Sequence, residues 1–183
     1  MFLIMSKKRE NMQLKYLLIS TLLFLSGCSK TPTAPLKTVD HVDLERYNGK
    51  WIEIARYENR FETGCAGATA HYVGKEDYIA VTNRCFDTNG VQSGEATGRA
   101  YALKDSNNSK LEVSFFRLFY GDYWVLMLGD NYQYSVVGDP SRKYLWILSR
   151  TKILSDVDKK SILNHLPALG YDANKLYWTT QQP

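Results

Sequence analysis

The amino-acid sequence predicts an all-β protein, an eight-stranded antiparallel up-and-down β-barrel with one C-terminal α-helix packed outside. Three observations lead to this prediction. From Trp51 onward, runs rich in β-branched and aromatic residues alternate with turn-forming residues at a spacing of roughly ten residues, a pattern typical of a barrel or a sandwich. Eight such runs are the number that closes a barrel with room for one small ligand. The separators between the runs are short enough for hairpins, so neighbouring strands should pair antiparallel. Only one stretch, near the C-terminus, carries a helical apolar face.

Strands are expected where apolar and β-branched residues lie between glycine-, aspartate- and asparagine-rich turns. The eight predicted strands are 51–58, 64–73, 78–86, 94–103, 110–117, 122–129, 132–138 and 143–150. A final strand is predicted at 175–179.

The predicted helix begins at the N-cap Ser155 and has acidic residues in its first turn. Its apolar face contains Ile162 and Leu166. Pro167 and Gly170 should end it.

The N-terminus has the features of a signal peptide, predicted over residues 1–27. Basic residues precede an apolar run at 16–25, which is too short to span a bilayer as a helix. Met12 would be a more typical start than Met1, and the choice between them stays open. Removing this segment takes away four basic groups and one acid, so the formal charge falls from +4 to +1. The basic balance therefore does not indicate a nucleic-acid partner.

The signal peptide ends in Leu25-Ser26-Gly27-Cys28, which resembles the lipobox of bacterial lipoproteins. The resemblance implies cleavage before Cys28 and lipidation of that cysteine, with an ordinary thiol as the alternative. Ser29 follows, so the sorting rule of such lipoproteins implies the outer membrane, facing the periplasm. Residues 28–42 are expected to form a lipidated tether, and residues 43–183 the barrel domain.

Two further cysteines support the hairpin at 64–86. Cys65 and Cys85 lie ten residues on either side of Lys75, the centre of the predicted turn. In a symmetric hairpin they would face each other, and an oxidising periplasm would favour a disulfide over two free thiols.

The alternation of side chains along a strand predicts which residues face inward, if no strand contains a bulge. With Trp51 and Arg150 inside, the inner face also carries Glu53, Ala55, Tyr57, Tyr144, Trp146 and Leu148. The outer face then carries Ile52, Ile54, Leu145 and Ile147, an apolar patch that the helix should cover.

Three motifs in order resemble the lipocalin family, and specifically the bacterial outer-membrane lipocalins. They are Gly49-Lys50-Trp51, Asp130-Asn131-Tyr132, and Arg150 at the end of a strand. Further likeness lies in 57–62, 113–116, 119–123 and 144–151, so that the resemblance covers about 44–182. It implies that Gly49, Trp51, Asp130, Tyr132 and Arg150 are structural, with Arg150 capping Trp51 at the closed end. A pairing of Glu53 with Arg150 is a further hypothesis.

The resemblance implies a calyx that binds small apolar ligands, without a cofactor. Bacterial relatives are thought to bind fatty acids or lysophospholipids and to support envelope maintenance, and a homodimer is a further expectation. Candidate ligand contacts are Tyr57, Tyr144, Trp146 and Leu148, with either Tyr123, Val125 and Met127 or Trp124, Leu126 and Leu128. The strand 122–129 is apolar on both faces, so the sequence leaves both sets open.

Two other classes of function compete with ligand binding. An enzyme is not expected, because His41, His71 and His165 show neither metal-ligand spacing nor a nucleophile constellation. Within a strand, His71 is the one candidate haem ligand, although a surface histidine is the favoured interpretation. The other class is a structural lipoprotein whose barrel is filled and takes no ligand.

Overall fold

A computed structural model describes residues 34–116 and 118–180 of the chain. The predicted signal peptide at 1–27 and the predicted lipidation site Cys28 lie outside these residues. The strands belong to one compact unit, Pro35–Pro183. Within the described residues, every helix is too short or too polar to cross a bilayer.

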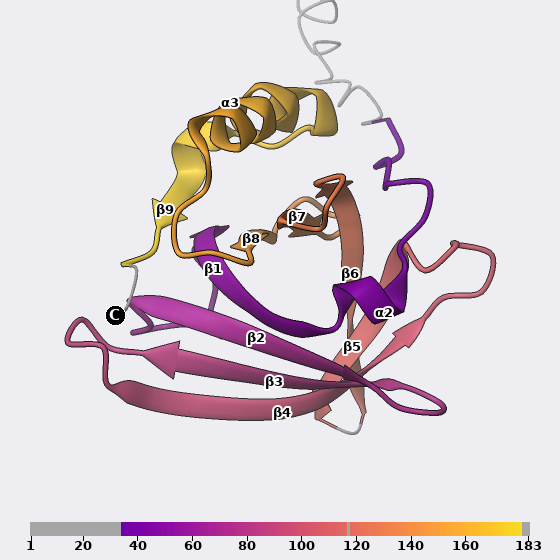
Figure 1. The fold of residues 1–183 in the computed structure, drawn as a ribbon, viewed down its shortest axis with the longest axis horizontal. Helices are drawn as coiled ribbons and strands as arrows, with labels where there is room; N and C mark the ends of the chain where they lie inside the picture. The colour runs from indigo at the N-terminus through magenta and orange to yellow at the C-terminus, as the bar shows by residue number, and fades with distance from the viewer. Residues whose placement is uncertain (1–33, 117, 181–183) are drawn as a thin grey trace, which may run out of the picture. The chain divides into compact units, whose positions relative to one another are not determined.

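The predicted barrel is confirmed. Its strands are β1 Gly49–Tyr57, β2 Gly67–Gly74, β3 Ile79–Phe86, β4 Gln92–Ala102, β5 Lys110–Phe116, β6 Phe119–Leu128, β7 Tyr134–Gly138 and β8 Leu145–Ser149. Each strand pairs antiparallel with the next, and β1 pairs with both β8 and β2, which closes the barrel (Figure 1). Every second connection, beginning with the β1–β2 loop, therefore lies at the same end of the barrel, which we call the mouth.

Strand β1 divides its second edge between two partners. Its first residues, Gly49–Ile52, pair with β2, whereas Ala55–Tyr57 pair with the final strand β9, Leu176–Trp178. Beyond β9, the backbone N–H of Thr179 donates to Ile54 O and that of Thr180 to Ala66 O. The C-terminal segment thus joins the two sides of the barrel wall where β1 and β2 separate.

A bulge in β1 changes which of its residues face inward. In the pairing with β8, Glu53 faces Leu148 and Ala55 faces Ile147, so Ile54 is an extra residue. The side chains of Ile54 and Ala55 both pack on the outer side, and the alternation reverses after them. The expectation of an unbulged strand was wrong, and Tyr57 lies outside the barrel instead of inside.

A second bulge resolves the ambiguous strand β6. Val125 faces Val137 and Met127 faces Val136, so one residue is again extra. Val125 and Leu128 point inward, and Leu126 and Met127 both pack on the outer side. Neither of the two predicted sets is correct as a whole, because each assumed an unbroken alternation.

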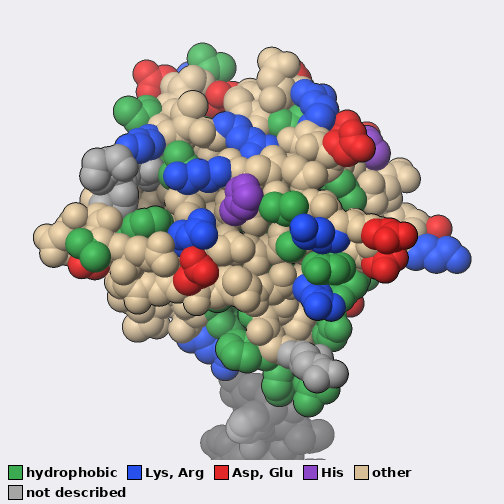
Figure 2. All heavy atoms as spheres, turned by 60° about the horizontal axis from the view of Figure 1, so that its bottom comes forward, with side chains coloured by type: hydrophobic (Ala, Val, Ile, Leu, Met, Phe, Trp, Pro, Cys, Tyr) green, Lys and Arg blue, Asp and Glu red, His purple; other side chains and the backbone are tan. Residues whose placement is uncertain are grey.

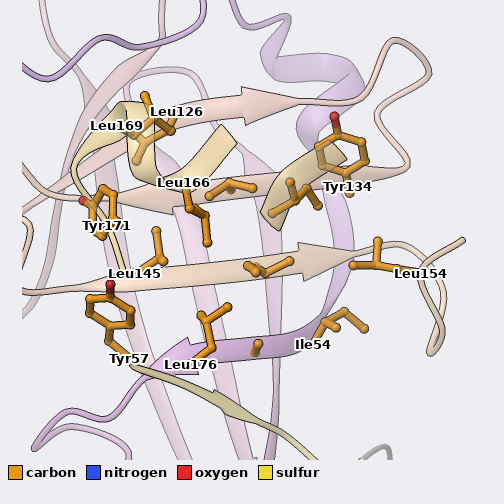
Figure 3. Close-up of a cluster of buried hydrophobic side chains, with 14 of the residues drawn as sticks. Ile54, Tyr57, Leu126, Tyr134, Leu145, Leu154, Leu166, Leu169, Tyr171 and Leu176 are labelled. Carbon is orange, nitrogen blue, oxygen red and sulfur yellow. The ribbon is translucent and has the colours of Figure 1, made fainter. Parts of the chain in front are cut away.

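The helix α3, Asp156–His165, covers the outer apolar patch as predicted (Figure 1). Ser155 caps it by accepting a hydrogen bond from Asp158 N at 3.0 Å. The short 3-10 helix η1, Leu166–Leu169, continues the chain to Gly170, whose φ of 83° ends it. We call the buried residues between these helices and the barrel wall the helix-side core; they include Ile54, Tyr57, Leu145 and Leu166 (Figure 3).

The end of the predicted tether belongs to the domain. Leu36 is buried in the helix-side core, and Val42 is fully buried inside the barrel. The N–H groups of Val39 and Val42 donate to Val125 O and Asn107 O. A four-residue helix that the sequence did not predict, α2 Leu44–Tyr47, follows the N-cap Asp43.

Candidate functional site

The closed end of the barrel is held by the first and third sequence motifs. Trp51 is fully buried and its indole N–H donates to Tyr47 O at 2.9 Å. The guanidinium of Arg150 lies over the Trp51 ring, 3.8 Å from its centroid. Gly49 has a φ of 93°, a backbone conformation that favours glycine. This geometry is consistent with the structural role that the sequence suggested for the three residues.

The second motif fastens helix α2 across the same end. The Tyr132 hydroxyl accepts a hydrogen bond from Asp43 N, the N-cap of α2, at 2.8 Å. Arg46 lies over the Tyr132 ring, and its Nη2 donates to Asp130 O at 3.2 Å. Asp130 contributes through its backbone carbonyl, so the motif acts as a turn that positions two partners of the helix.

Above this floor, buried tyrosine hydroxyls form a short hydrogen-bonded chain. Tyr47 Oη lies 2.8 Å from both Ser135 Oγ and Tyr123 Oη, and Tyr123 Oη lies 3.0 Å from Tyr72 Oη. Burial raises the pKa of Tyr47 to about 12 and that of Tyr123 well above its ordinary value. The chain is therefore neutral at physiological pH and satisfies polar groups inside an apolar interior.

The inner face of β4 leaves space inside the barrel. Val81 points inward and faces Gly98 on β4, and residues in direct register share a face. The inner face of β4 therefore consists of small residues, namely Gly94, Ala96, Gly98 and Ala100. Phe115 of β5 fills the space in front of Gly98, where an added Cβ would lie 2.8 Å from its ring. Ala100 near the closed end is buried, whereas Ala96 nearer the mouth is exposed. The interior is filled at its floor and open to solvent towards the mouth.

Several of the predicted ligand contacts point into the barrel, although the fully buried Val125 and the 5% exposed Leu148 belong to its filled part. Tyr123, Val125, Trp146 and Leu148 all belong to the interior, and Leu128 from the alternative set joins them. Tyr144 stacks on Trp146 at the mouth, with ring centroids 5.8 Å apart.

Four of the candidate contacts point away from the interior. Bulges turn Tyr57 and Met127 to the helix-side core, and Trp124 and Leu126 of the alternative set pack there as well. There the Tyr57 hydroxyl donates to Asp172 O at 2.9 Å, and Figure 3 shows its ring beside Leu176.

A charged group at the mouth was not predicted from the sequence. Arg56 and Glu53 are 4% and 3% exposed, and Arg56 Nη1 donates to Glu53 Oε1 at 2.6 Å. The predicted pairing of Glu53 with Arg150 is therefore wrong, because Arg150 instead donates to the backbone carbonyls of Lys50 and Arg46. The sequence does place two charged residues, Glu53 and Arg56, in the otherwise apolar stretch 51–57. They are three residues apart, so both face inward only because of the bulge between them.

Arg56 lies in a pocket of about 600 Å³ at the mouth. We call residues 58–66, the connection from β1 to β2, the mouth loop; it forms much of the pocket wall together with Tyr177 of β9. Glu62 of this loop lies 3.7 Å from Arg56 Nε and accepts a hydrogen bond from Trp146 Nε1 at 2.9 Å. The mouth is thus polar, although the space beneath it is mostly apolar.

The predicted disulfide between Cys65 and Cys85 is present, with Cα atoms 5.3 Å apart. The predicted register, with Cys65 directly opposite Cys85, is wrong, because Cys85 pairs with Ala68. Cys65 belongs to the mouth loop, whose end folds back so that Ala66 N donates to Phe86 O. The disulfide therefore attaches the mouth loop to β3.

The histidine weighed as a haem ligand lies on the outer surface of the barrel. His71 lies on the outer face of β2, between the inward-facing Ala70 and Tyr72. The described residues contain no group of three or more side chains able to hold a metal ion. Positive and negative side chains are interspersed over the face in Figure 2, and hydrophobic ones gather at its lower edge.

Several exposed apolar side chains surround the mouth. Phe116, Leu118 and Phe119 at the β5–β6 turn are 73%, 85% and 76% exposed. Phe61 in the mouth loop is 63% exposed, and Val91 beside the β3–β4 turn is 61% exposed. An apolar molecule approaching this end would therefore meet an apolar rim.

A closed antiparallel barrel with a plugged floor, an external helix and an interior open at one end defines a calyx-type binding protein. Residues 42–181 match the family model described as a lipocalin-like domain. The chain belongs to the lipocalin family.

Named relatives match over most of their length. The outer membrane lipoprotein Blc of Citrobacter freundii is 39% identical, over 88% of this chain and 93% of that protein. The Vibrio cholerae protein of the same name is 37% identical, over 90% of this chain and 97% of that one. Temperature-induced lipocalin-1 of Arabidopsis thaliana is 35% identical, over 82% of this chain and 86% of that protein.

A solved structure supports the fold independently. Insecticyanin from the tobacco hornworm Manduca sexta superposes with a TM-score of 0.66, over 79% of this chain and 84% of that one. Its sequence identity is 24%, so this likeness concerns the fold alone.

Proposed function

We propose that the barrel binds one amphiphile with a long apolar chain, a fatty acid or a lysophospholipid, and stores or transports it in envelope maintenance. The observation that carries this proposal is the inner face of β4 near the mouth, where the inward-facing Ala96 is exposed and Gly94 has no side chain. Trp146, Leu148 and Val113 offer apolar surface to the same interior. Each methylene of an acyl chain buried there would contribute about 0.8 kcal/mol to binding.

The proposed location is the outer membrane, with the protein anchored through lipid on Cys28 and facing the periplasm. The lipobox-like Leu25–Cys28 supports this proposal, as do relatives named outer membrane lipoproteins. Cys28→Ala should release the protein from the membrane fraction. A variant that stayed in that fraction and kept the mass of the lipidated protein would contradict the proposed anchor.

A tryptophan placed in the interior tests the binding site. Ala96→Trp would fill the space beside β4, whereas Thr97→Trp places the same side chain on the outer face one residue later. Titration of delipidated protein with a fluorescent fatty acid and a fluorescent lysophospholipid should show saturable binding to wild type and Thr97→Trp. Ala96→Trp should bind at least about tenfold more weakly, a loss of 1.4 kcal/mol. Circular dichroism establishes that both variants fold.

The alternative is a structural lipoprotein with a filled barrel. The tyrosine chain, which occupies the interior above the floor, is the observation that favours it. This alternative predicts no saturable binding and no effect of Ala96→Trp on ligand. Native mass spectrometry of protein purified from its own membrane would decide between them, since a bound lipid adds a defined mass.

A further inference from the structure

The mouth loop sends one side chain down into the barrel. Glu62 is 19% exposed, whereas its neighbours Phe61 and Thr63 are exposed. Its Oε2 accepts hydrogen bonds from Trp146 Nε1 at 2.9 Å and from Asn59 Nδ2 at 2.6 Å. The loop's carboxylate thus fills a position at the top of the interior space.

Arg56 faces that carboxylate with an unused donor. Its Nη1 donates to Glu53 and its Nη2 donates to Cys65 O at 2.8 Å. The third nitrogen, Nε, is buried without a hydrogen-bond partner among the described residues, and Glu62 Oε2 lies 3.7 Å from it. A buried guanidinium N–H without a partner is costly, so a better-placed anion would be stabilised there.

The charges at the mouth balance with one anion beside Arg56. Burial, together with the neighbouring Glu62, holds the pKa of Glu53 well above its usual range and favours its neutral form. Glu62 then supplies the negative charge that Arg56 requires. Another monoanion in the position of the Glu62 carboxylate would neutralise the charge of Arg56 equally well.

We propose that Glu62 occupies the position of a ligand's anionic headgroup, and that a carboxylate or phosphate on a bound amphiphile displaces it. The incoming oxygens would accept from Arg56 Nε and Trp146 Nε1, the two donors outside the mouth loop that lie beside Glu62 Oε2. This inference rests on the proposed function, and it assigns the headgroup class and the two donors that recognise it. The apolar chain would lie below, beside the inner face of β4.

The attachment of the mouth loop is compatible with such an exchange. Cys65 is fixed to β3 by its disulfide, so its carbonyl keeps its bond to Arg56 when the rest of the loop moves. Gly64, with a φ of 83°, directly precedes this fixed point. Glu62 can therefore leave without dismantling the Arg56 site.

Paired ligands separate the headgroup from the chain. Oleate is compared with oleyl alcohol, and oleoyl lysophosphatidic acid with monoolein, by calorimetric titration of wild type, Glu62→Gln and Glu76→Gln. Glu62→Gln removes the competing charge, so it should bind the anionic member of a pair about tenfold more tightly and the neutral member within about twofold of wild type. Glu76→Gln removes an exposed carboxylate from the β2–β3 turn and should leave all four affinities unchanged.

Arg56→Met and Trp146→Phe test the two donors. Arg56→Met should weaken binding of the anionic member about tenfold without weakening the neutral one. Trp146→Phe also removes apolar surface, so it should weaken both members but the anionic one several-fold more, and it serves if Arg56→Met does not fold. A gain in Glu62→Gln with only oleate or only the lysophosphatidic acid would assign the site to that headgroup. An unchanged ratio of anionic to neutral affinity in Glu62→Gln would overturn the inference and leave the proposed function standing. Absence of saturable binding by all four ligands to wild type would overturn both.

Discussion

Arg150 covers the indole ring of Trp51 and also donates hydrogen bonds from Nη1 to Lys50 O and from Nη2 to Arg46 O, each at 2.8 Å. One side chain at the end of β8 therefore joins the start of β1 to helix α2. Since Trp51 itself donates to Tyr47 O, both residues contact the same turn of chain. The floor of the barrel depends on this pair more than on any ligand.

Arg150→Met should destabilise the barrel. It removes the cation–π contact and the hydrogen bonds to backbone carbonyls, and the expected loss is about 2 kcal/mol in the free energy of unfolding. Urea denaturation of the delipidated protein measures this loss. Arg99→Met is the control, because the exposed Arg99 lies over the half-buried Tyr78 on the outer face and should matter little. A change in ligand affinity without a change in stability would contradict the structural role.

Glu53→Gln should alter how stability depends on pH. The folded-state pKa of Glu53 is raised, so the folded protein holds a proton that the unfolded chain releases above about pH 4.5. The stability contributed by Glu53 is fully present below that pH and is lost as the pH rises towards the folded-state pKa. Glutamine cannot titrate, so the variant should gain stability relative to wild type between acidic and neutral pH. Thermal unfolding across this range measures the difference, with Glu76→Gln as the control; a constant difference would contradict the raised pKa.

Removing the disulfide should destabilise the domain without unfolding its interior. The bond joins residues 20 apart, and the chain-entropy model gives about 3 kcal/mol for a loop of this size. The double variant Cys65→Ser, Cys85→Ser should show this loss in urea denaturation. Reduced wild type should match it, and a reductant should have no further effect on the double variant.

Ile162→Ala should cost about 3 kcal/mol, because Ile162 is fully buried in the helix-side core. Val157 lies on the same helix but is 78% exposed, so the unfolding free energy of Val157→Ala should stay close to that of wild type. Since α3 packs outside the barrel, binding of a fluorescent fatty acid should be retained in both variants. Lost binding in a folded Ile162→Ala protein would show that the helix influences the interior.

The strand order, the external helix and the disulfide were all predictable from local patterns. Turn residues between β-rich runs predicted the hairpins, and Ser155 with Ile162 predicted the helix. The outer patch under that helix was also predicted correctly, because Ile54 lies before the face reversal in β1 and β8 has no bulge.

The mouth could not be predicted in the same way. A single extra residue at Ile54 turns Arg56 inward and Tyr57 outward, and no local sequence signal marked this bulge. The same effect at Leu126 mixed the two sets proposed for β6. Glu62 lies in a loop, where periodicity gives no orientation, so its contact with Trp146 depends on tertiary structure alone.

The division of β1 between β2 and β9 has a consequence for the order of assembly. The wall beside Arg56 is completed by Leu176–Trp178 and by the hydrogen bonds of Thr179 and Thr180. A chain that is synthesised or exported N-terminus first cannot finish this wall until residues 176–180 have emerged. Until then the backbone of Ala55–Tyr57 lacks its partner strand on this edge, so the barrel closes last beside Arg56.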